Sequence, residues 1–435
     1  MDNEEKSEDV SSRPSSDINV EAPPPPQPAP AGPTPPPNGG LTAWVQVAGS
    51  FFLYFNTWGI LNAFGAYQTY YESGKLFHAS SSDISWIGSI EAFLLLIMGV
   101  FAGPIYDRGY LRLLLVTGAF LVVFGHMMLS LCHAYWEVIL AQGIVIGVGT
   151  GLLFVPCVAI NAQYFSTRLG LAVGIAATGS SLGGVIYPIV LYRLINEIGF
   201  AWAVRVEGFL ALATLLIPIA LLKLRVQPPK VRAIIDWSAF VDVQFMSFVF
   251  SGIVAYMGLF VFFFYVAYYS QDQHFLGTAM SFYLVPIFNA ASCFGRSLPN
   301  ALADKTGSFN LLAPGTFLAG VFMLCMMAVS SGAGIIVLAI FTGFISGVMI
   351  GMPPLCFVAL TPDKSRLGTR MGMGFAMLGF GILAGGPGGG GILGDTPPLD
   401  WTGIWTFGGV TACVAGLGFW GVRVMKFGWK VNIKA

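Results

Sequence analysis

Residues 84–106 read ISWIGSIEAFLLLIMGVFAGPIY, and Asp107 and Arg108 follow directly. About 20 consecutive apolar residues in a helix cross the hydrocarbon core of a bilayer, so this run is long enough to span it. Glu91 is the only charged residue in the run. The stretch therefore predicts a transmembrane helix that carries one carboxyl group into the membrane and ends in a charged turn.

Similar apolar runs of membrane-spanning length occur on both sides of this stretch along the chain. Charged residues make up 10% of the 435 positions and hydrophobic residues 55%, whereas about a quarter of the residues of a soluble domain are charged. We therefore predict an all-α membrane protein with twelve transmembrane helices. The expected spans are 43–66, 84–106, 111–132, 136–160, 169–192, 202–224, 244–268, 279–302, 309–330, 333–359, 369–394 and 402–424.

The longest internal connection divides these spans into two sets of six. We predict an N-terminal six-helix bundle at 41–224, a linker at 225–243, a C-terminal six-helix bundle at 244–424 and a short tail at 425–435. Residues 1–40 are acidic, rich in proline and poor in apolar side chains, which predicts a disordered tail. The proline run could also dock a partner, whose identity the sequence leaves unknown.

The distribution of lysine and arginine predicts the orientation in the membrane. An even number of spans places both termini on one side. On that side lie 17 of the 21 lysine and arginine residues, and three lie on the other side. Because cytoplasmic loops are enriched in these residues, both termini are predicted to be cytoplasmic.

The two sets of six spans carry matching residues at a nearly constant spacing. The pair DR at 107–108 precedes DK at 304–305 by 197 residues, and RLG at 168–170 recurs 198 residues later at 366–368. Some secondary transporters are built from two parallel six-helix repeats, with the substrate site between them. The spacing therefore predicts a duplicated six-helix unit.

No residue pattern predicts catalysis. Serine, histidine and aspartate occur outside any nucleophile-elbow setting, and the sequence has no Walker loop for ATP. None of the six cysteines has metal-ligand spacing, and no block of like charge suggests nucleic-acid binding. We therefore predict that the protein is not an enzyme, needs no cofactor, and contacts lipid and a small molecule rather than nucleic acid.

Two motifs resemble those of a known family. Residues 164–176 read YFSTRLGLAVGIA and closely resemble the fifth-helix signature of the monocarboxylate transporters, a family of the major facilitator superfamily. Residues 38–40, which read NGG and precede Trp44, resemble the first-helix motif of that family, especially its fungal branch. The resemblance implies a rocker-switch secondary transporter, often of a carboxylate with a proton, in the plasma membrane or alternatively the vacuolar membrane.

The charged turn after residues 84–106 and its counterpart in the second half resemble the cytoplasmic gate motif of the same superfamily. An acid beside a base can hold neighbouring helix ends together, although exposed pairs of this kind contribute little energy. A solvated pair of loop charges is the alternative. The gate that the resemblance implies consists of Asp107, Arg108, Arg168, Asp304 and Lys305.

The chain also departs from the family pattern. Members that carry small acids keep a lysine in the first helix, where this chain has Asn62. They also keep an acid four residues before an arginine in the eighth helix; here the arginine is Arg296, but Ser292 replaces the acid. The site for a small carboxylate and its proton is therefore only partly present, which favours a larger substrate.

Arg296 is the first candidate for substrate binding. It lies well inside the eighth span, where a charge is costly unless it faces a cavity or a partner. Its guanidinium could bind a carboxylate through two hydrogen bonds, and a helix-packing or gating pair is the alternative. Asn62, Asn289 and Tyr265 are further candidates, although tyrosines near helix ends also mark the membrane interface.

Glu91 is the first candidate for proton coupling. Desolvation inside the membrane favours the neutral acid, which suits a proton carrier; a hydrated position near the outer rim is the alternative. His126 in the third span could relay protons because histidine titrates near neutral pH. A neutral histidine packed in the core is the alternative for that residue.

Glycines predict two features of the helices. In the fourth span Gly143, Gly147 and Gly151 recur every four residues, which allows close helix contact. In the eleventh span residues 385–391 read GGPGGGG, which should break or bend the helix, either as a gating hinge or as a tolerated irregularity.

These observations predict a proton-linked secondary transporter of an organic anion, with export of a secondary metabolite favoured. Proton-coupled uptake of a short monocarboxylate is one alternative. A membrane sensor of the same fold that does not transport is another, less favoured because such sensors usually carry a larger cytoplasmic extension than this tail of about 40 residues.

Overall fold

The computed structural model describes residues 36–225, 233–363 and 366–430. The predicted disordered tail up to residue 35, part of the predicted linker and the last five residues lie outside these ranges, and so does the side chain of Asp304. All the regular elements in the described ranges are helical.

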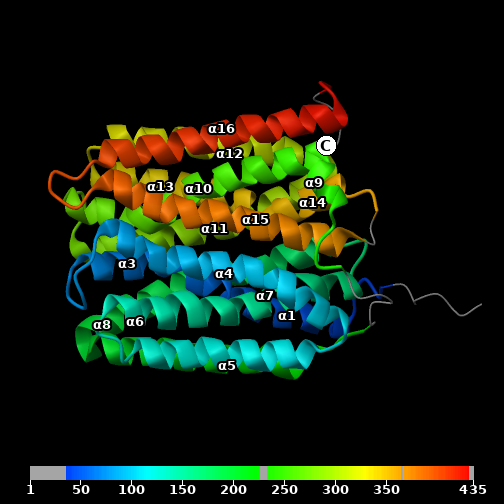
Figure 1. Cartoon of the computed structure of the whole chain (residues 1–435), viewed down its shortest axis with the longest axis horizontal. Helices are drawn as coiled ribbons and strands as arrows, with labels where there is room; N and C mark the ends of the chain where they lie inside the picture. The colour runs from blue at the N-terminus through cyan, green and yellow to red at the C-terminus, as the bar shows by residue number, and fades with distance from the viewer. Residues whose placement is uncertain (1–35, 226–232, 364–365, 431–435) are drawn as a thin grey trace, which may run out of the picture. The chain divides into compact units, whose positions relative to one another are not determined.

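Residues 41–221 form the N-terminal half of the helical body and residues 243–427 form the C-terminal half (Figure 1). The first half consists of α1 (Leu41–Asn56), α2 (Trp58–Asn62), α3 (Phe64–Glu72), α4 (Ser81–Asp107), α5 (Leu111–Leu129), α6 (Tyr135–Val138), the π-helix η1 (Ile139–Ile146), α7 (Gly147–Tyr164) and α8 (Leu169–Leu221). The second consists of α10 (Val243–Asp272), α11 (Thr278–Thr306), α12 (Phe309–Cys325), the 3-10 turn η2 (Met326–Ala328), α13 (Gly332–Gly351), α14 (Pro353–Leu360), α15 (Leu367–Leu393) and α16 (Trp401–Phe427), with α9 (Ser238–Val241) before them.

The predicted all-α fold with twelve spans is confirmed. Within the described ranges, ten helical stretches are long and apolar enough to cross a membrane. One of them, α8, covers two predicted spans, because Gly199 adopts φ 79° and ψ 167° and interrupts the helix between them. The first predicted span corresponds to α1–α3, where the helix is interrupted at Thr57 and Ala63.

Polar residues fix where several helices begin. A side-chain oxygen at an N-cap satisfies a backbone N–H that has no partner inside the helix. Ser80, Asp242, Ser331 and Asp400 accept such bonds at the starts of α4, α10, α13 and α16. These caps agree with the predicted span boundaries to within a few residues.

Successive spans alternate in direction, so their connections fall at two ends. We call the basic end the one with the connections α4–α5, α7–α8, α8–α9, α11–α12 and α14–α15. It is the side to which 17 of the 21 lysines and arginines are assigned, in these connections, the adjoining helix ends and the two ends of the chain. The opposite end has the connections α3–α4, α5–α6, α10–α11, η2–α13 and α15–α16. The two ends differ in how the halves meet.

Helices pack closely, both within a half and between the halves, at glycines, which have no side chain. In the N-terminal half, a Cβ on Gly151 would lie 2.5 Å from the Cβ of Met98, which confirms the predicted close contact of the fourth span. Between the halves, α4 packs against α15 and α8 against α11. A Cβ on Gly386 would lie 2.5 Å from Ser89 Oγ, and one on Gly390 would lie 2.6 Å from Ser82 Cα.

The predicted helix break at residues 385–391 is wrong. The helix α15 is continuous from Leu367 to Leu393 and includes Pro387. Inside a membrane an unpaired backbone group has no water to bind, so the backbone keeps its helical hydrogen bonds despite the low helix propensity of glycine. The glycines instead let α15 approach α4 and α10.

Hydrogen bonds join the halves at the opposite end. The hydroxyl of Tyr265 lies 3.2 Å from the carbonyl oxygen of Ser81 and 3.1 Å from that of Gly386. The backbone N–H of Ser81 donates to Asp395 Oδ1 at 3.1 Å. We call this group, with the bond from Ser82 Oγ to the Pro387 carbonyl (3.0 Å), the outer closure.

Candidate functional site

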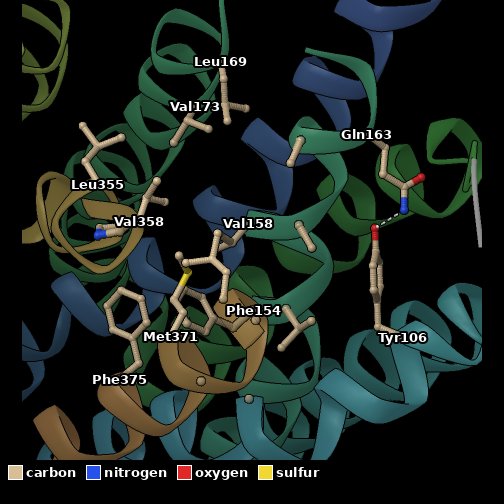
Figure 2. Close-up of a pocket in the computed structure, with 18 of the residues that line it drawn as sticks. Tyr106, Phe154, Val158, Gln163, Leu169, Val173, Leu355, Val358, Met371 and Phe375 are labelled. Atoms are coloured by element: carbon tan, nitrogen blue, oxygen red, sulfur yellow. Dashed lines mark hydrogen bonds between the residues drawn. The ribbon is translucent and has the colours of Figure 1, made fainter. Parts of the chain in front are cut away.

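A cavity of about 360 Å³ lies between the halves in the part of the molecule near the basic end. Figure 2 shows side chains from both halves around it. Phe154 and Val158 come from α7, Val173 from α8, and Met371 and Phe375 from α15. Because the outer closure joins the halves at the other end, this conformation offers its cavity on the side of the basic end.

The lining of the cavity is mostly apolar. The rings of Phe154 and Phe375, from opposite halves, meet edge to face with centroids 5.7 Å apart. Polar groups lie at its rim, where Gln163 donates to the hydroxyl of Tyr106 at 3.2 Å (Figure 2). Such a lining suits the apolar or aromatic body of a ligand.

A narrow pocket of about 30 Å³ shares Phe154, Phe375 and Asn300 with the cavity and reaches Arg296. Tyr54 and Trp58 also line it. Trp58 directly follows the helix interruption at Thr57, and discontinuous helices commonly form substrate sites in transporters. Arg296 is therefore the charged residue at the inner end of an apolar path.

The guanidinium of Arg296 is only partly satisfied. Its side chain is 1% exposed. One terminal nitrogen donates to Ser180 Oγ on α8, and Nε donates to Ser292 Oγ at 3.3 Å. The other terminal nitrogen, Nη2, has no partner, and no carboxylate within the described ranges forms a salt bridge with Arg296. A buried cation with an unused donor is costly, and an anionic ligand would relieve that cost.

The structure brings some of the other predicted substrate residues to Arg296 and separates one. The amide of Asn62 lies 3.5 Å from the backbone carbonyl of Ser180, whose hydroxyl binds Arg296. Asn289 lies on α11 two turns from Arg296, packs against Gly184 and has an unused Oδ1. Tyr265 belongs to the outer closure and lies apart from this site.

The predicted proton-coupling residues lie inside the N-terminal half. Glu91 is fully buried, and neither of its carboxyl oxygens has a hydrogen-bond partner. His126 is also buried, with Nδ1 2.8 Å from the carbonyl of Val122 in its own helix. Sequence reasoning missed Glu207, which is fully buried on α8 and accepts a hydrogen bond from Tyr67. The signal that singled out Glu91, an acid within an apolar span, applies equally to Glu207.

The predicted gate residues gather at the basic end. Asp107 is buried at the end of α4 and lines the cavity, whereas Arg108 next to it is exposed. Arg168 is the exposed N-cap residue of α8, and Lys305 is exposed near the end of α11. The gating role of this group stays a prediction.

A set of ion pairs that the sequence did not reveal lies beside this group. Arg370 on α15 donates to Asp236 Oδ2 and to Asp242 Oδ2, both at 2.9 Å. Burial opposes ionisation of Asp236, but hydrogen bonds from Ser238 and Arg370 hold its pKa below the usual value. The segment before α10 is thereby fastened to α15.

The chain resembles known transporters over most of its length. Residues 47–362 match the family described as Major Facilitator Superfamily. Over 379 residues the chain is 61% identical to the MFS-type transporter dbaD of Emericella nidulans, covering 87% of this chain and 85% of that protein. It is 38% identical over 362 residues to the aspyridones efflux protein apdF of the same organism, covering 83% and 74%. It is 35% identical over 396 residues to the MFS transporter asaE of Aspergillus flavus, covering 88% and 89%. The chain therefore belongs to the major facilitator superfamily and is a multi-pass membrane transporter, not an enzyme.

Proposed function

We propose that the protein exports a metabolite with an apolar or aromatic body and an anionic group. The observation that carries the proposal is the position of Arg296, whose Nη2 has no partner, at the inner end of an apolar cavity. The anion would bind the guanidinium, and the apolar body would pack against the apolar lining of the cavity, which includes Phe154 and Phe375. The name of the aspyridones efflux protein, a relative at 38% identity, supports export of a secondary metabolite.

The size of the cavity supports a larger substrate than a short monocarboxylate. Sites for small molecules usually have volumes of about 300–1,000 Å³, and this cavity of about 360 Å³ falls in that range. A two- or three-carbon acid would leave most of the apolar lining without contacts. The motif at 164–176 supports a place in the monocarboxylate-transporter-like branch, with a substrate that has diverged from small acids.

The transport cycle would exchange two states by rocking the halves against each other. The excess of lysine and arginine supports a cytoplasmic location for the basic end, so the described state would take up substrate from the cytoplasm. Opening the outer closure and closing the gate around Asp107 would release it outside. A plasma-membrane location fits this direction, and proton binding at Glu91 would drive it.

The anchor role of Arg296 is tested by pairs of acids and their methyl esters. Wild-type proteoliposomes should transport aromatic carboxylates in preference to the esters. The Arg296→Gln variant should lose that preference, with affinity for the acids weakened about 10- to 100-fold, because charge-assisted hydrogen bonds are worth about 1.5–3 kcal/mol. Arg296→Lys, which keeps the charge but not the fork of donors, should lie between.

Ser297→Ala is the matched control, since the Ser297 hydroxyl bonds within its own helix to the carbonyl of Cys293. Unchanged transport and affinity for the acids in folded Arg296→Gln would rule out the anchor role. Equal transport of acids and esters by the wild type would rule out an anionic substrate.

A further inference from the structure

Two buried carboxyl groups lie inside the N-terminal half. Glu91 on α4 and Glu207 on α8 are both 0% exposed. Both oxygens of Glu91 and Oε1 of Glu207 have no hydrogen-bond partner. No salt bridge to either is found in the described part of the chain. An ionised carboxylate buried without a cation is costly, so each of these groups favours its neutral form.

Three side chains connect the two carboxyl groups. The hydroxyl of Tyr67 donates to Glu207 Oε2. The neighbouring Tyr71 donates to Gln142 Oε1 at 2.7 Å. Gln142 belongs to η1, which packs against α4, the helix that carries Glu91. The rings of Tyr67 and Tyr71 lie one helical turn apart on α3, with centroids separated by 5.9 Å. Polar groups thus lead from one acid to the other.

The helix that carries Gln142 is irregular at this point. Gln142 lies in η1 (Ile139–Ile146). π-helical turns are rare in proteins, and many of those that are known lie at functional sites. Gly147, directly after η1, allows close approach to α4, since a Cβ there would lie 3.0 Å from Glu91 Cα. The irregular helix and the small residue together bring the segment that carries Gln142 close to α4 at Glu91.

The two acids lie at a similar depth below the opposite end. Glu91 is ten residues from Ser81, the start of α4, and Glu207 is eight residues beyond the interruption at Gly199. At 1.5 Å per residue these distances are about 15 Å and about 12 Å. Arg296 lies ten residues from Thr306, at the basic end of α11, which is about 15 Å. The acids therefore lie nearer the opposite end, and Arg296 lies nearer the basic end.

The other titratable groups around the acids supply no fixed positive charge. Tyr187 on α8 and Cys132 after α5 lie within electrostatic range of the cluster. His126 on α5 packs against Gly208, next to Glu207, but binds a backbone carbonyl of its own helix. Towards the opposite end the cluster is covered by aromatic rings, with Tyr70 stacked on Phe200 at 5.2 Å.

We propose that Glu207 and Glu91 form one proton-binding site of the N-terminal half, connected by Tyr67, Tyr71 and Gln142. Two carboxyl groups linked in this way titrate as a pair. The hydroxyl of Tyr67 donates to Glu207 when that carboxylate is ionised and accepts from it when the acid is protonated. A proton arriving from the opposite end binds a carboxylate oxygen, and it would leave towards the basic end after the halves have rocked, so that each cycle moves it across the membrane.

The position of the site indicates how it would act, and this step rests on the proposed export function. Tyr67 and Tyr71 belong to α3, where Gly65 contacts the carbonyl of Phe263 in the other half. Glu91 belongs to α4, which carries Ser81 and Ser82 of the outer closure. Protonation would therefore act on the closure between the halves and would not compete with substrate at Arg296.

Infrared spectroscopy of the full-length protein in lipid vesicles tests the site without any substrate. The C=O stretching band of protonated carboxyl groups is followed during a pH titration. We compare wild type with Glu207→Gln, Glu91→Gln, the double variant and Tyr67→Phe. Glu197→Gln is the matched control, because Glu197 is an exposed acid on the same helix α8.

We expect each single glutamine variant to remove the band of one carboxyl group and to shift the titration of the other. Tyr67→Phe should move the frequency of the Glu207 band and leave that of Glu91, and the control should match wild type. A band at neutral pH that is the same in wild type and in the folded double variant would overturn the proposal.

A transport measurement separates this inference from the proposed function. With an aromatic carboxylate as probe, the double variant should lose accumulation driven by a pH gradient and keep exchange of labelled for unlabelled probe. Infrared bands as expected with no transport of any probe would refute the export function alone. If the infrared bands change as expected but the double variant still accumulates the probe in response to a pH gradient, the coupling role is refuted.

Discussion

At the scale of single residues, Glu72 is placed to make the outer closure sensitive to pH. It is the last residue of α3, and its carboxylate accepts hydrogen bonds from Ser81 Oγ and Gln68 Nε2, both at 2.9 Å. Burial raises the pKa of Glu72 to about 7 against the opposing effect of these hydrogen bonds, and Asp395 of the other half adds to the rise. The closed state therefore binds a proton more tightly than a state in which Glu72 is hydrated.

The sign of the pH effect follows from linkage. Closure should be most stable below the ordinary pKa of a glutamate, about 4.3, and should weaken as the pH rises through about 7. Spin labels on Lys75→Cys and His274→Cys, exposed at the opposite end of the two halves, should move apart over that range. The Glu72→Gln variant should stay closed throughout. A variant that opens over the same pH range as its parent would show that another group controls the closure.

The candidate site could be predicted in part from its residue types. Arg296 and Glu91 stand out in the sequence as charged residues within apolar spans, because the physical cost of such charges is general. The same criterion applies to Glu207, which was missed. The partners of these residues could not be predicted, because Ser180 is 116 residues from Arg296 and Tyr67 is 140 residues from Glu207. Only packing of the helices brings those side chains together, and the same holds for the salt bridges of Arg370.

At the scale of helices, the glycines of α15 differ in how closely a neighbouring helix packs against them. A Cβ on Gly385 would collide with the carbonyl oxygen of Met257 on α10, whereas a Cβ on Gly391 would meet no atom within 4 Å. Both lie in the same run of residues and in the same helix. Their difference separates the packing role of glycine from its low helix propensity.

We expect Gly385→Ala to lower the stability of the protein in detergent by about 1–3 kcal/mol, because α10 and α15 must move apart. Gly391→Ala should leave stability unchanged or raise it by about 0.5–1 kcal/mol, since alanine favours the helix. Thermal unfolding of the two purified variants measures both effects. Equal destabilisation by the two alanines would contradict the packing role.

The positions of the helices were predictable, but their irregularities were not. Apolar length located the spans, whereas the interruptions of α1–α3 and the π-helix η1 have no local signal comparable to proline. The predicted break at residues 385–391 does not occur, because the low helix propensity of glycine is outweighed by a stronger requirement. In a membrane the backbone must satisfy its own hydrogen bonds, which preserves the helix.

At the scale of the whole molecule, the longest internal connection predicted the six-and-six division of the spans, and motif pairs repeated at offsets of 197 and 198 residues predicted a duplicated six-helix unit. The cavity was not predictable, because its walls come from helices of both halves and its depth depends on which end is closed. The charge distribution, by contrast, makes a definite prediction about the orientation in the membrane.

That orientation can be measured in cells with a cysteine-free parent chain. A membrane-impermeant thiol reagent added outside should label Lys75→Cys, at the opposite end, in intact cells. Lys305→Cys, at the basic end, should react only after the cells are permeabilised. Both residues are exposed, so access to reagent is the only difference. Labelling in the reverse order would place the termini outside and would make the described state one that faces the exterior.

Arg296 joins α11 to α8 through the hydroxyl of Ser180. A carboxylate is a stronger acceptor for a guanidinium than a neutral hydroxyl, so an arriving anion would displace Ser180. Binding of the anion would then break the hydrogen bond between Arg296 and Ser180 that joins the halves. A neutral compound of the same shape would enter the cavity and leave that hydrogen bond intact. Anions would thus be selected over neutral compounds because only an anion releases the contact that holds the halves together, in addition to binding more tightly.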